Sequence, residues 1–370
     1  MAVLEPTSTE EQILQRFKNV TGWRKDFAER LKRDGLPNRR VEGWKWTDVQ
    51  RAAKGIRGYG KVQFQCSVPP QWTEVKRSAS QDFFANLLAY AGVQSVPYIE
   101  LSNWVKIIDV DFRALPGVSH AALTINAGAG ETIRIHEHYS SAEQAFSAIG
   151  VDYVVGKGAR VERVVLIDEA PEAVLLLSSG VTLNEGGEFV QTVVSQGARL
   201  LRHETQLHHA GGGAKATLNG AYLVGNGLHS DFTTRVEMHG PGGELSQTAK
   251  GIAYGGGRGV FQGKINVKQA AQKTAANMTH KGMIVDEKSE IDAKPELEIY
   301  ADDVECSHGN AIGTLDEMAL FYMQQRGLPE PEARRLLVES FLDEALGEIS
   351  HERTAGTIRG LISKRLKGLA

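Results

Sequence analysis

The pattern of hydrophobic and polar positions changes twice along the chain, and it begins with a helical period. Apolar residues recur at spacings of three, four and seven near the start, which predicts one amphipathic helix over residues 11–34 that stops at Gly35. The segment "GLPNRRVEGWKWTDVQRAA" follows as a loop that leads into a short helix. We expect its Trp44/Trp46 pair to anchor packing, with a partner or ligand contact as the alternative. The apolar positions of the helix are Ile13, Phe17, Val20, Phe27 and Leu31.

From about residue 95 to 313, short segments of period two and high β propensity alternate with glycine clusters. "VERVVLID", "EFVQTVV" and "KATLNGAYLVG" are examples, and "ELEIYADDV" is predicted to be a strand that continues into "ECSHG". No helical period interrupts residues 173–263, which excludes alternating strands and helices there. A sandwich, a barrel or a stacked β-solenoid remains, and the regular strand-and-turn spacing favours the solenoid.

The third pattern is helical again. "LDEMALFYMQQRG" predicts a helix that ends at Gly327, "EARRLLVESFLDEALGEI" a second one and "TIRGLISKRLKGLA" a final basic amphipathic one. The predicted organisation is therefore a helical region over 1–94, a β core over 95–313 and a helical region over 314–370. The exposed parts of the last region are a candidate docking surface. Its apolar positions are Leu315, Met318, Ala319, Tyr322, Leu336, Leu337, Phe341, Leu342, Ala345 and Leu346.

Composition narrows the classes of partner. The 370 residues carry a net charge of −3, with 42 Lys and Arg against 45 Asp and Glu, which gives no electrostatic case for nucleic acid or an anionic membrane. No apolar run approaches the roughly 18 residues of a membrane span. The opening "MAVLEPTSTEEQ" lacks the features of a secretory or organelle leader, so we expect a cytoplasmic protein.

The glycine-rich loops do not match nucleotide-binding motifs. "GGGAKAT" lacks the spacing and the Lys–Ser/Thr pair of a phosphate-binding loop, and "NAGAGETI" and "GGGRGV" lack the third glycine of a dinucleotide fingerprint. There is no G-x-S-x-G and no H-E-x-x-H motif. Familiar ATP, NAD, hydrolase and metalloprotease sites are therefore excluded.

The chain contains only two cysteines, Cys66 and Cys306. They cannot supply the four thiolates of a common iron–sulfur centre or of a closed zinc site. Residues i and i+2 of a strand share one face, so Cys306 and His308 would project together as one thiolate and one imidazole. Both are good ligands for iron or zinc. The same spacing also fits an ordinary strand end with a small buried cysteine.

The other histidines of the predicted strands are expected to be wall residues rather than ligands. Because neighbouring strand residues face opposite ways, at most one ring of the His208-His209 pair can point inward. These histidines are His203, His208, His209, His229, His239 and His280.

Two stretches resemble a known family. "KPELEIYADDVECSHGNAIGTLDEMALFYMQQRGLPEPEARRLLVESFLDEAL" closely resembles the C-terminal signature of the SufB/SufD family of iron–sulfur cluster assembly proteins. "RRVEGWKWTDV" is similar to that family's N-terminal Arg-Arg…Trp-Lys-aromatic-Thr motif in its SufD branch. The length and the absence of further cysteines favour SufD over SufB.

The resemblance implies a fold and a set of partners. The implied fold is a mainly β, right-handed parallel β-helix flanked by helical regions, and the implied role is that of a non-catalytic subunit of a SufBCD complex. Such a subunit pairs with SufB through the β-helix and binds the ATPase SufC through its C-terminal helices. It supports iron acquisition and cluster assembly at a site that it shares with SufB. Formation of a homodimer by the isolated chain remains an alternative. We expect the isolated chain to bind no cofactor stably.

The resemblance also implies roles for individual residues. His308 matches a SufD histidine at the SufB–SufD interface, and Cys306 matches the neighbouring family cysteine. We expect His308 to be a neutral-imidazole ligand of iron or a nascent cluster and Cys306 to be a supporting or transient one. The docking surface for SufC would include Leu315, Met318, Tyr322, Leu336, Leu337 and Phe341.

Three rival interpretations remain. A β-helical polysaccharide hydrolase could use Asp302-Asp303 as general acid and base. A stand-alone metal-binding module could use His203, His208 and His280. A SufB-like homodimer could hold a cluster between two copies of Cys306 and His308, although the shortage of cysteines argues against it.

Overall fold

Two nine-stranded sheets form the body of the protein, and each is parallel except for its first strand. The computed structural model describes residues 7–75, 84–101 and 107–366. Sheet B contains, in spatial order, β1 (Val62–Cys66), β4 (Ile107–Ala114), β6 (Thr132–Ser141), β8 (Arg160–Asp168), β10 (Glu188–Ser195), β12 (Lys215–Val224), β14 (Glu244–Ala253), β16 (Thr274–Ile284) and β18 (Val304–Gly313). Sheet A contains β2 (Gln71–Glu74), β3 (Ser95–Leu101), β5 (Gly117–Ala127), β7 (Ala145–Val155), β9 (Val174–Leu183), β11 (Leu200–His209), β13 (His229–Met238), β15 (Arg258–Val267) and β17 (Glu290–Ile299).

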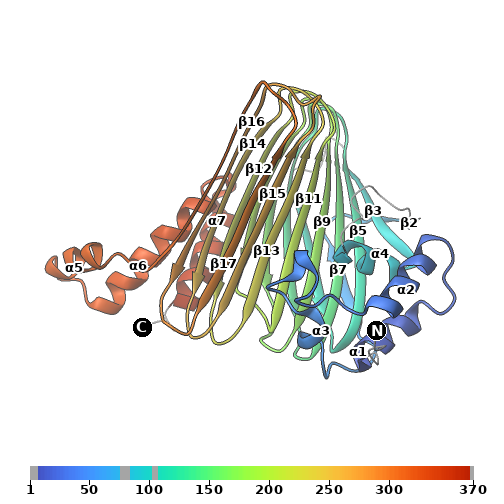
Figure 1. Cartoon of the computed structure of the whole chain (residues 1–370), viewed down its shortest axis with the longest axis horizontal. Helices are drawn as coiled ribbons and strands as arrows, with labels where there is room; N and C mark the ends of the chain where they lie inside the picture. Colours follow the sequence, from blue (N-terminus) through green and yellow to red (C-terminus); the bar gives the residue numbers. More distant parts are fainter. Residues whose placement is uncertain (1–6, 76–83, 102–106, 367–370) are drawn as a thin grey trace.

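The strand order identifies the architecture. From β3 onward, consecutive strands alternate between the two sheets, and each strand pairs in parallel with the strand two positions further along the chain. The chain therefore winds through about eight turns of a β-solenoid (Figure 1). This confirms the solenoid over the sandwich and the barrel, and residues 173–263 contain strands and turns only, as predicted.

Glycines allow the corners between the sheets. Gly158, Gly186, Gly213 and Gly242 recur at intervals of 27 to 29 residues, each with φ between 61° and 64°. Only glycine adopts this left-handed conformation without a steric cost. The Gly186 N–H donates to the carbonyl of Gly212 and the Gly213 N–H to that of Pro241, so successive corners stack on one another. This stacking explains why the glycine clusters follow the strand period.

Aliphatic side chains fill the space between the sheets, but one ion pair is enclosed with them. Arg163 of β8 donates from Nε and Nη2 to the two carboxylate oxygens of Glu137, at 2.9 and 2.7 Å, and from Nη1 to Gln191 at 2.6 Å. The hydroxyl of Tyr139 donates to the same carboxylate at 2.6 Å. Arg163 and Glu137 are both fully buried, so each depends on the other for compensation of its charge.

The N-terminal helices cover the outer face of sheet A. They are α1 (Ser8–Arg16), α2 (Trp23–Asp34), the 3₁₀ turn η1 (Glu42–Trp44), α3 (Val49–Ala52) and α4 (Phe84–Ala91). Their apolar faces pack on residues of β5, β7 and β9, including Ala122, Phe146 and Leu176. α4 approaches so closely that a Cβ at Gly150 would lie 2.7 Å from the ring of Tyr90.

The prediction of one helix over residues 11–34 is wrong. The chain forms α1 and α2, separated at Gly22, which has φ 59° and ψ −143° and is the N-cap of α2. Apolar spacing continues across this break because both helices present their apolar residues to the same core. The predicted end at Gly35 is confirmed.

The C-terminal helices pack on the outer face of sheet B. They are α5 (Glu317–Gln325), α6 (Glu330–Asp343), the 3₁₀ turn η2 (Glu344–Leu346) and α7 (Glu352–Leu366). Their buried residues meet Val164, Val194, Leu223 and Ile252 of the sheet, while α5 projects away from the solenoid (Figure 1). The three predicted helices are confirmed, with Gly327 beyond the end of α5 at φ 89°. The last four residues of "TIRGLISKRLKGLA" lie outside the described residues.

The two ends of the solenoid differ. At the first end, β1 pairs antiparallel with β4 and β2 pairs antiparallel with β3, so reversed strands close the sheets. At the second end, β17 and β18 each pair with one strand, and no described residue pairs with their outer edges. The second end therefore presents two strand edges to solvent.

The predicted continuous strand from Glu296 through Gly309 is wrong. Residues 300–303 form a corner, so β17 belongs to sheet A and β18 to sheet B. Backbone bonds to the preceding turn hold the corner: the Tyr300 N–H donates to Val267, and the Asp303 carbonyl accepts from Lys273. Apolar alternation through Ile299 and Tyr300 conceals this corner in the sequence.

No described helix is long and apolar enough to span a membrane.

We predict that Arg163→Ala lowers the free energy of unfolding by about 3–5 kcal/mol, because it leaves the Glu137 carboxylate buried without its cation. Denaturant titration measures the change. The matched control is Arg160→Ala in the same strand, since Arg160 pairs with Glu188 on the partly exposed outer face and should cost under about 1 kcal/mol. Equal losses in the two variants would contradict the role given to the interior pair.

Candidate functional site

Cys306 and His308 lie on β18, the last strand of sheet B. Cys306 pairs in register with Ala276 and packs against the interior core, and Asn310 bonds to the interior residue His280. Residues 306, 308 and 310 of a strand lie on the same face, so His308 faces the interior of the solenoid together with Cys306 and Asn310, as predicted. It pairs in register with buried Met278 yet is itself exposed, because no further turn covers it. Its side chain makes no hydrogen bond or ion pair with any other described residue.

The thiol of Cys306 is half-buried. Burial raises its pKa, and a hydrogen bond with the backbone of Ala276 opposes this only in part. Cys66 lies on β1, at the opposite edge of the nine-stranded sheet, roughly 38 Å away at the usual strand spacing. The two thiols therefore cannot share a metal within one chain. A groove of about 720 Å³ on the outer face of sheet B also reaches Cys306.

A polar column continues from this strand into the solenoid. His280 Nδ1 donates a hydrogen bond to Asn310 Oδ1 at 2.7 Å, and its Nε2 accepts one from the Tyr222 hydroxyl at 2.8 Å. Its ring stacks on Phe261 at 4.7 Å. Burial lowers the pKa of His280 to about 4, so its ring is neutral at pH 7. Asn310 was not singled out in the sequence, although the spacing Cys306-x-His308-x-Asn310 already places it on the same face.

The structure does not bring together the rival set of His203, His208 and His280. His203 stacks inside the solenoid on Phe232, His280 lies in the column just described, and His208 lies on the outer face of sheet A. His209 points inward and bonds to Ala214, which confirms that only one ring of the His208-His209 pair does so.

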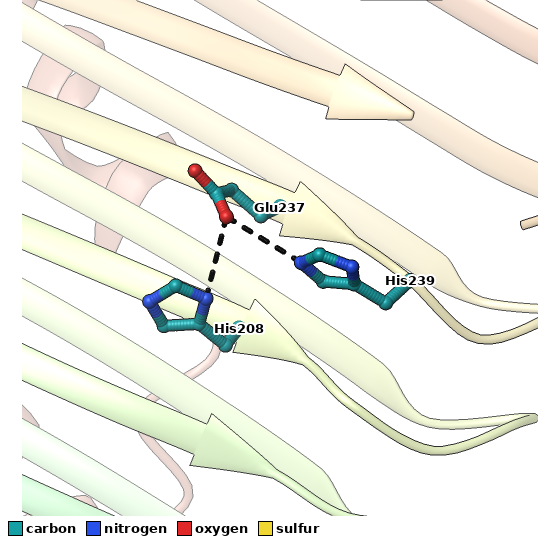
Figure 2. A group of neighbouring side chains, drawn as sticks. All are labelled: His208, Glu237 and His239. Carbon is teal, nitrogen blue, oxygen red and sulfur yellow. Dashed lines mark hydrogen bonds and ion pairs between the residues drawn. The ribbon is translucent and has the colours of Figure 1, made fainter. Parts of the chain in front are cut away.

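The described residues do contain one group of three potential metal ligands: His208, Glu237 and His239 (Figure 2). Sequence reasoning missed Glu237 altogether, and its local signal was the i, i+2 spacing in "EMH". The pair Asp302-Asp303 of the hydrolase interpretation lies in the exposed corner between β17 and β18 rather than on a strand.

Comparison with known proteins identifies the family. A family model described as "SUF system FeS cluster assembly, SufBD core domain" matches residues 112–341. The chain belongs to the SufBD family. The matched part runs from β4 to α6 and includes Cys306 and His308.

Individual relatives agree with this assignment. The chain is 28% identical to the iron–sulfur cluster assembly protein SufD of Escherichia coli over 252 residues, which is 68% of this chain and 60% of that protein. It is 28% identical to protein ABCI7 of Arabidopsis thaliana over 264 residues, 70% of this chain and 55% of the relative. SufD of Bacillus subtilis is 28% identical over 205 residues, 52% of this chain and 46% of that protein. The matches thus span about half to three fifths of the relatives' length.

In this SufBD chain, the predicted docking residues differ in exposure. Met318 and Tyr322 on α5 are 76% and 59% exposed, and Phe321 between them is exposed as well. Leu336, Leu337 and Phe341 on α6 are half-buried, and Leu315 is buried. Leu336 borders a groove of about 530 Å³ between α6 and α7. Phe321 was missed, although it occupies the i+3 position from Met318.

The motif "RRVEGWKWTDV" joins the N-terminal region to sheet A. Trp44 is buried, with the guanidinium of Arg202 lying 3.9 Å from its ring centroid, which confirms the packing role for Trp44. Trp46 is half-buried and its ring contacts Lys45. Arg202 donates to Asp231 at 2.7 Å, to Glu204 at 2.7 Å and to the Gly43 carbonyl at 2.9 Å. Thr47 donates to the same Asp231 carboxylate.

The carboxylates of Asp231 and Glu204 compensate the positive charge of buried Arg202. Burial by itself lowers the pKa of Arg202, but Asp231 and Glu204 outweigh it and raise the pKa. Burial lowers the pKa of neighbouring His229 to about 4, and its neutral ring meets Thr47 at 3.1 Å. The motif is therefore a buried polar attachment of the N-terminal region to the solenoid.

We predict that Asp231→Ala destabilises the protein by about 3–5 kcal/mol, because buried Arg202 loses one of its two carboxylates. Limited proteolysis should then cut the N-terminal segment faster than in the wild type. The control is Glu42→Ala, which removes an exposed ion pair with Lys294 from the same segment and should leave both readouts unchanged. An Asp231→Ala protein with wild-type stability and protease resistance would refute this attachment.

Proposed function

We propose that this chain is a non-catalytic subunit of a SufBCD-type iron–sulfur cluster assembly complex. It pairs with a SufB-type chain through the open end of the solenoid, and it binds an ATPase of the SufC type through its C-terminal helices. The observation that carries the proposal is the position of His308 on the uncovered interior face of β18, beside two strand edges with which no described residue pairs. The proposal places the complex in the cytoplasm, where ATP is available to the ATPase.

The strand edges support pairing with another chain. Exposed edges of long strands carry backbone donors and acceptors that favour addition of a further strand. The apolar residues Ile299, Tyr300 and Ile312 are exposed at this end. A SufB-type partner would satisfy both the backbone and the apolar surface. The same edges also permit pairing with a second copy of this chain when the partner is absent.

The ligand count supports a site that is shared between subunits. Cys306 and His308 give at most one thiolate and one imidazole, whereas a common cluster takes four ligands. A partner that covers the open turn would bring its own thiolate and carboxylate to the same face. His308 is then a direct ligand of iron or of the nascent cluster, which is the cargo of the complex. Half-buried Cys306 is a supporting or transient ligand.

The C-terminal helices supply a separate surface for the ATPase. Met318, Phe321 and Tyr322 form an exposed apolar patch on α5, which projects from the solenoid (Figure 1). The groove beside Leu336 lies between the next two helices. α5 and α6 follow β18 directly in the chain, so force from a bound ATPase would reach the open turn through a short connection.

We predict that His308→Ala leaves assembly with a SufB-type partner intact but lowers the iron and acid-labile sulfide of the complex isolated from cells by tenfold or more. The control is Ser307→Ala, which changes the neighbouring side chain on the opposite face, where Ser307 accepts from Asn277 at 2.8 Å. A His308→Ala complex with normal iron and sulfide content would refute the ligand role.

We predict that the double variant Met318→Ser/Tyr322→Ser reduces co-purification of the ATPase at least tenfold without affecting the SufB-type partner. The change removes exposed apolar contacts and alters no buried residue. Thr357→Ala on the exposed side of α7 is the control. The docking surface is wrongly placed if the double variant retains the ATPase at the wild-type ratio.

A further inference from the structure

Three potential metal ligands meet on the outer face of sheet A, at the ends of β11 and β13. His208 is the penultimate residue of β11, Glu237 is the penultimate residue of β13, and His239 follows β13 directly. His208 and Glu237 are register partners, so their side chains lie next to each other on one face. Figure 2 shows both rings directed at the Glu237 carboxylate.

The distances fit a metal site better than they fit hydrogen bonds. Glu237 Oε2 lies 3.4 Å from His208 Nδ1 and 3.4 Å from His239 Nε2. Charge-assisted hydrogen bonds are usually about 2.7–2.9 Å long. Ligand atoms bound tetrahedrally at about 2.0–2.1 Å from an ion lie about 3.3–3.4 Å apart. One ligand atom from each of the three residues lies within 4.8 Å of the others.

The surroundings hold these ligands in place. Arg235 donates to the other carboxylate oxygen, Oε1, at 2.7 Å, which leaves Oε2 directed at the two rings. The backbone N–H of His239 donates to the His209 carbonyl at 3.0 Å, so the residue is fixed at the start of its corner. Burial raises the pKa of Glu237, but Arg235 and His208 outweigh burial, so the pKa is lowered and the group is a carboxylate at neutral pH.

We propose that His208, Glu237 and His239 bind one exchangeable divalent transition-metal ion on the outer face of sheet A. Two imidazoles and one carboxylate are a donor set typical of Zn²⁺ and of non-haem Fe²⁺, and three protein ligands leave at least one position for water. Asn266 pairs in register with Glu237, and its Oδ1 has no hydrogen-bond partner among the described residues. This oxygen is an acceptor one strand away for a metal-bound water.

The site is expected to exchange its ion readily. His239 has a 44% exposed side chain, and the cations of Arg235 and Lys268 act on the same carboxylate. Their repulsion lowers the affinity for a further cation, so chelators used in purification would remove the ion. The proposal is independent of the proposed function, because β11 and β13 belong to sheet A and neither contributes to the open end.

The test is a Zn²⁺ titration of the full chain, freed of metal, against a chromophoric chelator, followed by a Co²⁺ titration read by its visible absorption. We expect one Zn²⁺ per chain and the intense d–d bands of four-coordinate Co²⁺. His239→Ala and Glu237→Gln should each weaken Zn²⁺ binding at least tenfold and abolish those bands.

One control variant separates this site from other surface histidines. His138→Ala removes a surface histidine with a carboxylate partner, Asp111 at 3.0 Å. It should bind Zn²⁺ like the wild type. Melting temperatures without metal verify that every variant folds, and Zn²⁺ should raise the melting temperature of the wild type but not of Glu237→Gln.

The proposal is overturned if the wild type binds no stoichiometric Zn²⁺. It is equally overturned if His239→Ala and Glu237→Gln bind as the wild type does, or if His138→Ala removes the ion.

Discussion

The structure depends on the backbone hydrogen bonds between successive turns of the solenoid, and this requirement is unmet at one end. Each interior strand is paired on both edges, and the antiparallel strands β1 and β2 close the first end. β17 and β18 have no described strand on their outer edges. Because the last turn is uncovered, an interior-facing position holds an exposed histidine rather than a core residue. The chemistry proposed for His308 belongs to this end, which lies within the residues that match the SufBD family model.

Buried polar groups determine how the parts are arranged around the solenoid. The Arg163–Glu137 pair lies inside the turns, and the Arg202–Asp231 contact attaches the N-terminal region to sheet A. The C-terminal helices are attached to sheet B mainly by apolar packing, assisted by Lys250, which contacts Glu344 and the Phe341 ring. The two helical regions thus cover opposite sheets (Figure 1).

Sequence patterns predicted the features that depend on local periodicity. The stop at Gly35, the three C-terminal helices and the shared face of Cys306 and His308 follow from spacing alone. Spacing only favoured the solenoid over a sandwich or a barrel, and the family resemblance implied it. The break at Gly22 and the corner at residues 300–303 were missed because apolar spacing continues through both. The cluster of His208, Glu237 and His239 was missed because it depends on the register of β11 with β13, which are separated by a whole turn of chain.

Amide hydrogen exchange of β17 and β18 tests the open end most directly. In the isolated chain, the amides on the outer edge of β18 should exchange much faster than those of β16, which is paired on both sides. On addition of a SufB-type chain, the β18 amides should become as slow as those of β16. Unchanged exchange at β17 and β18 in the complex, with new protection elsewhere, would contradict the account.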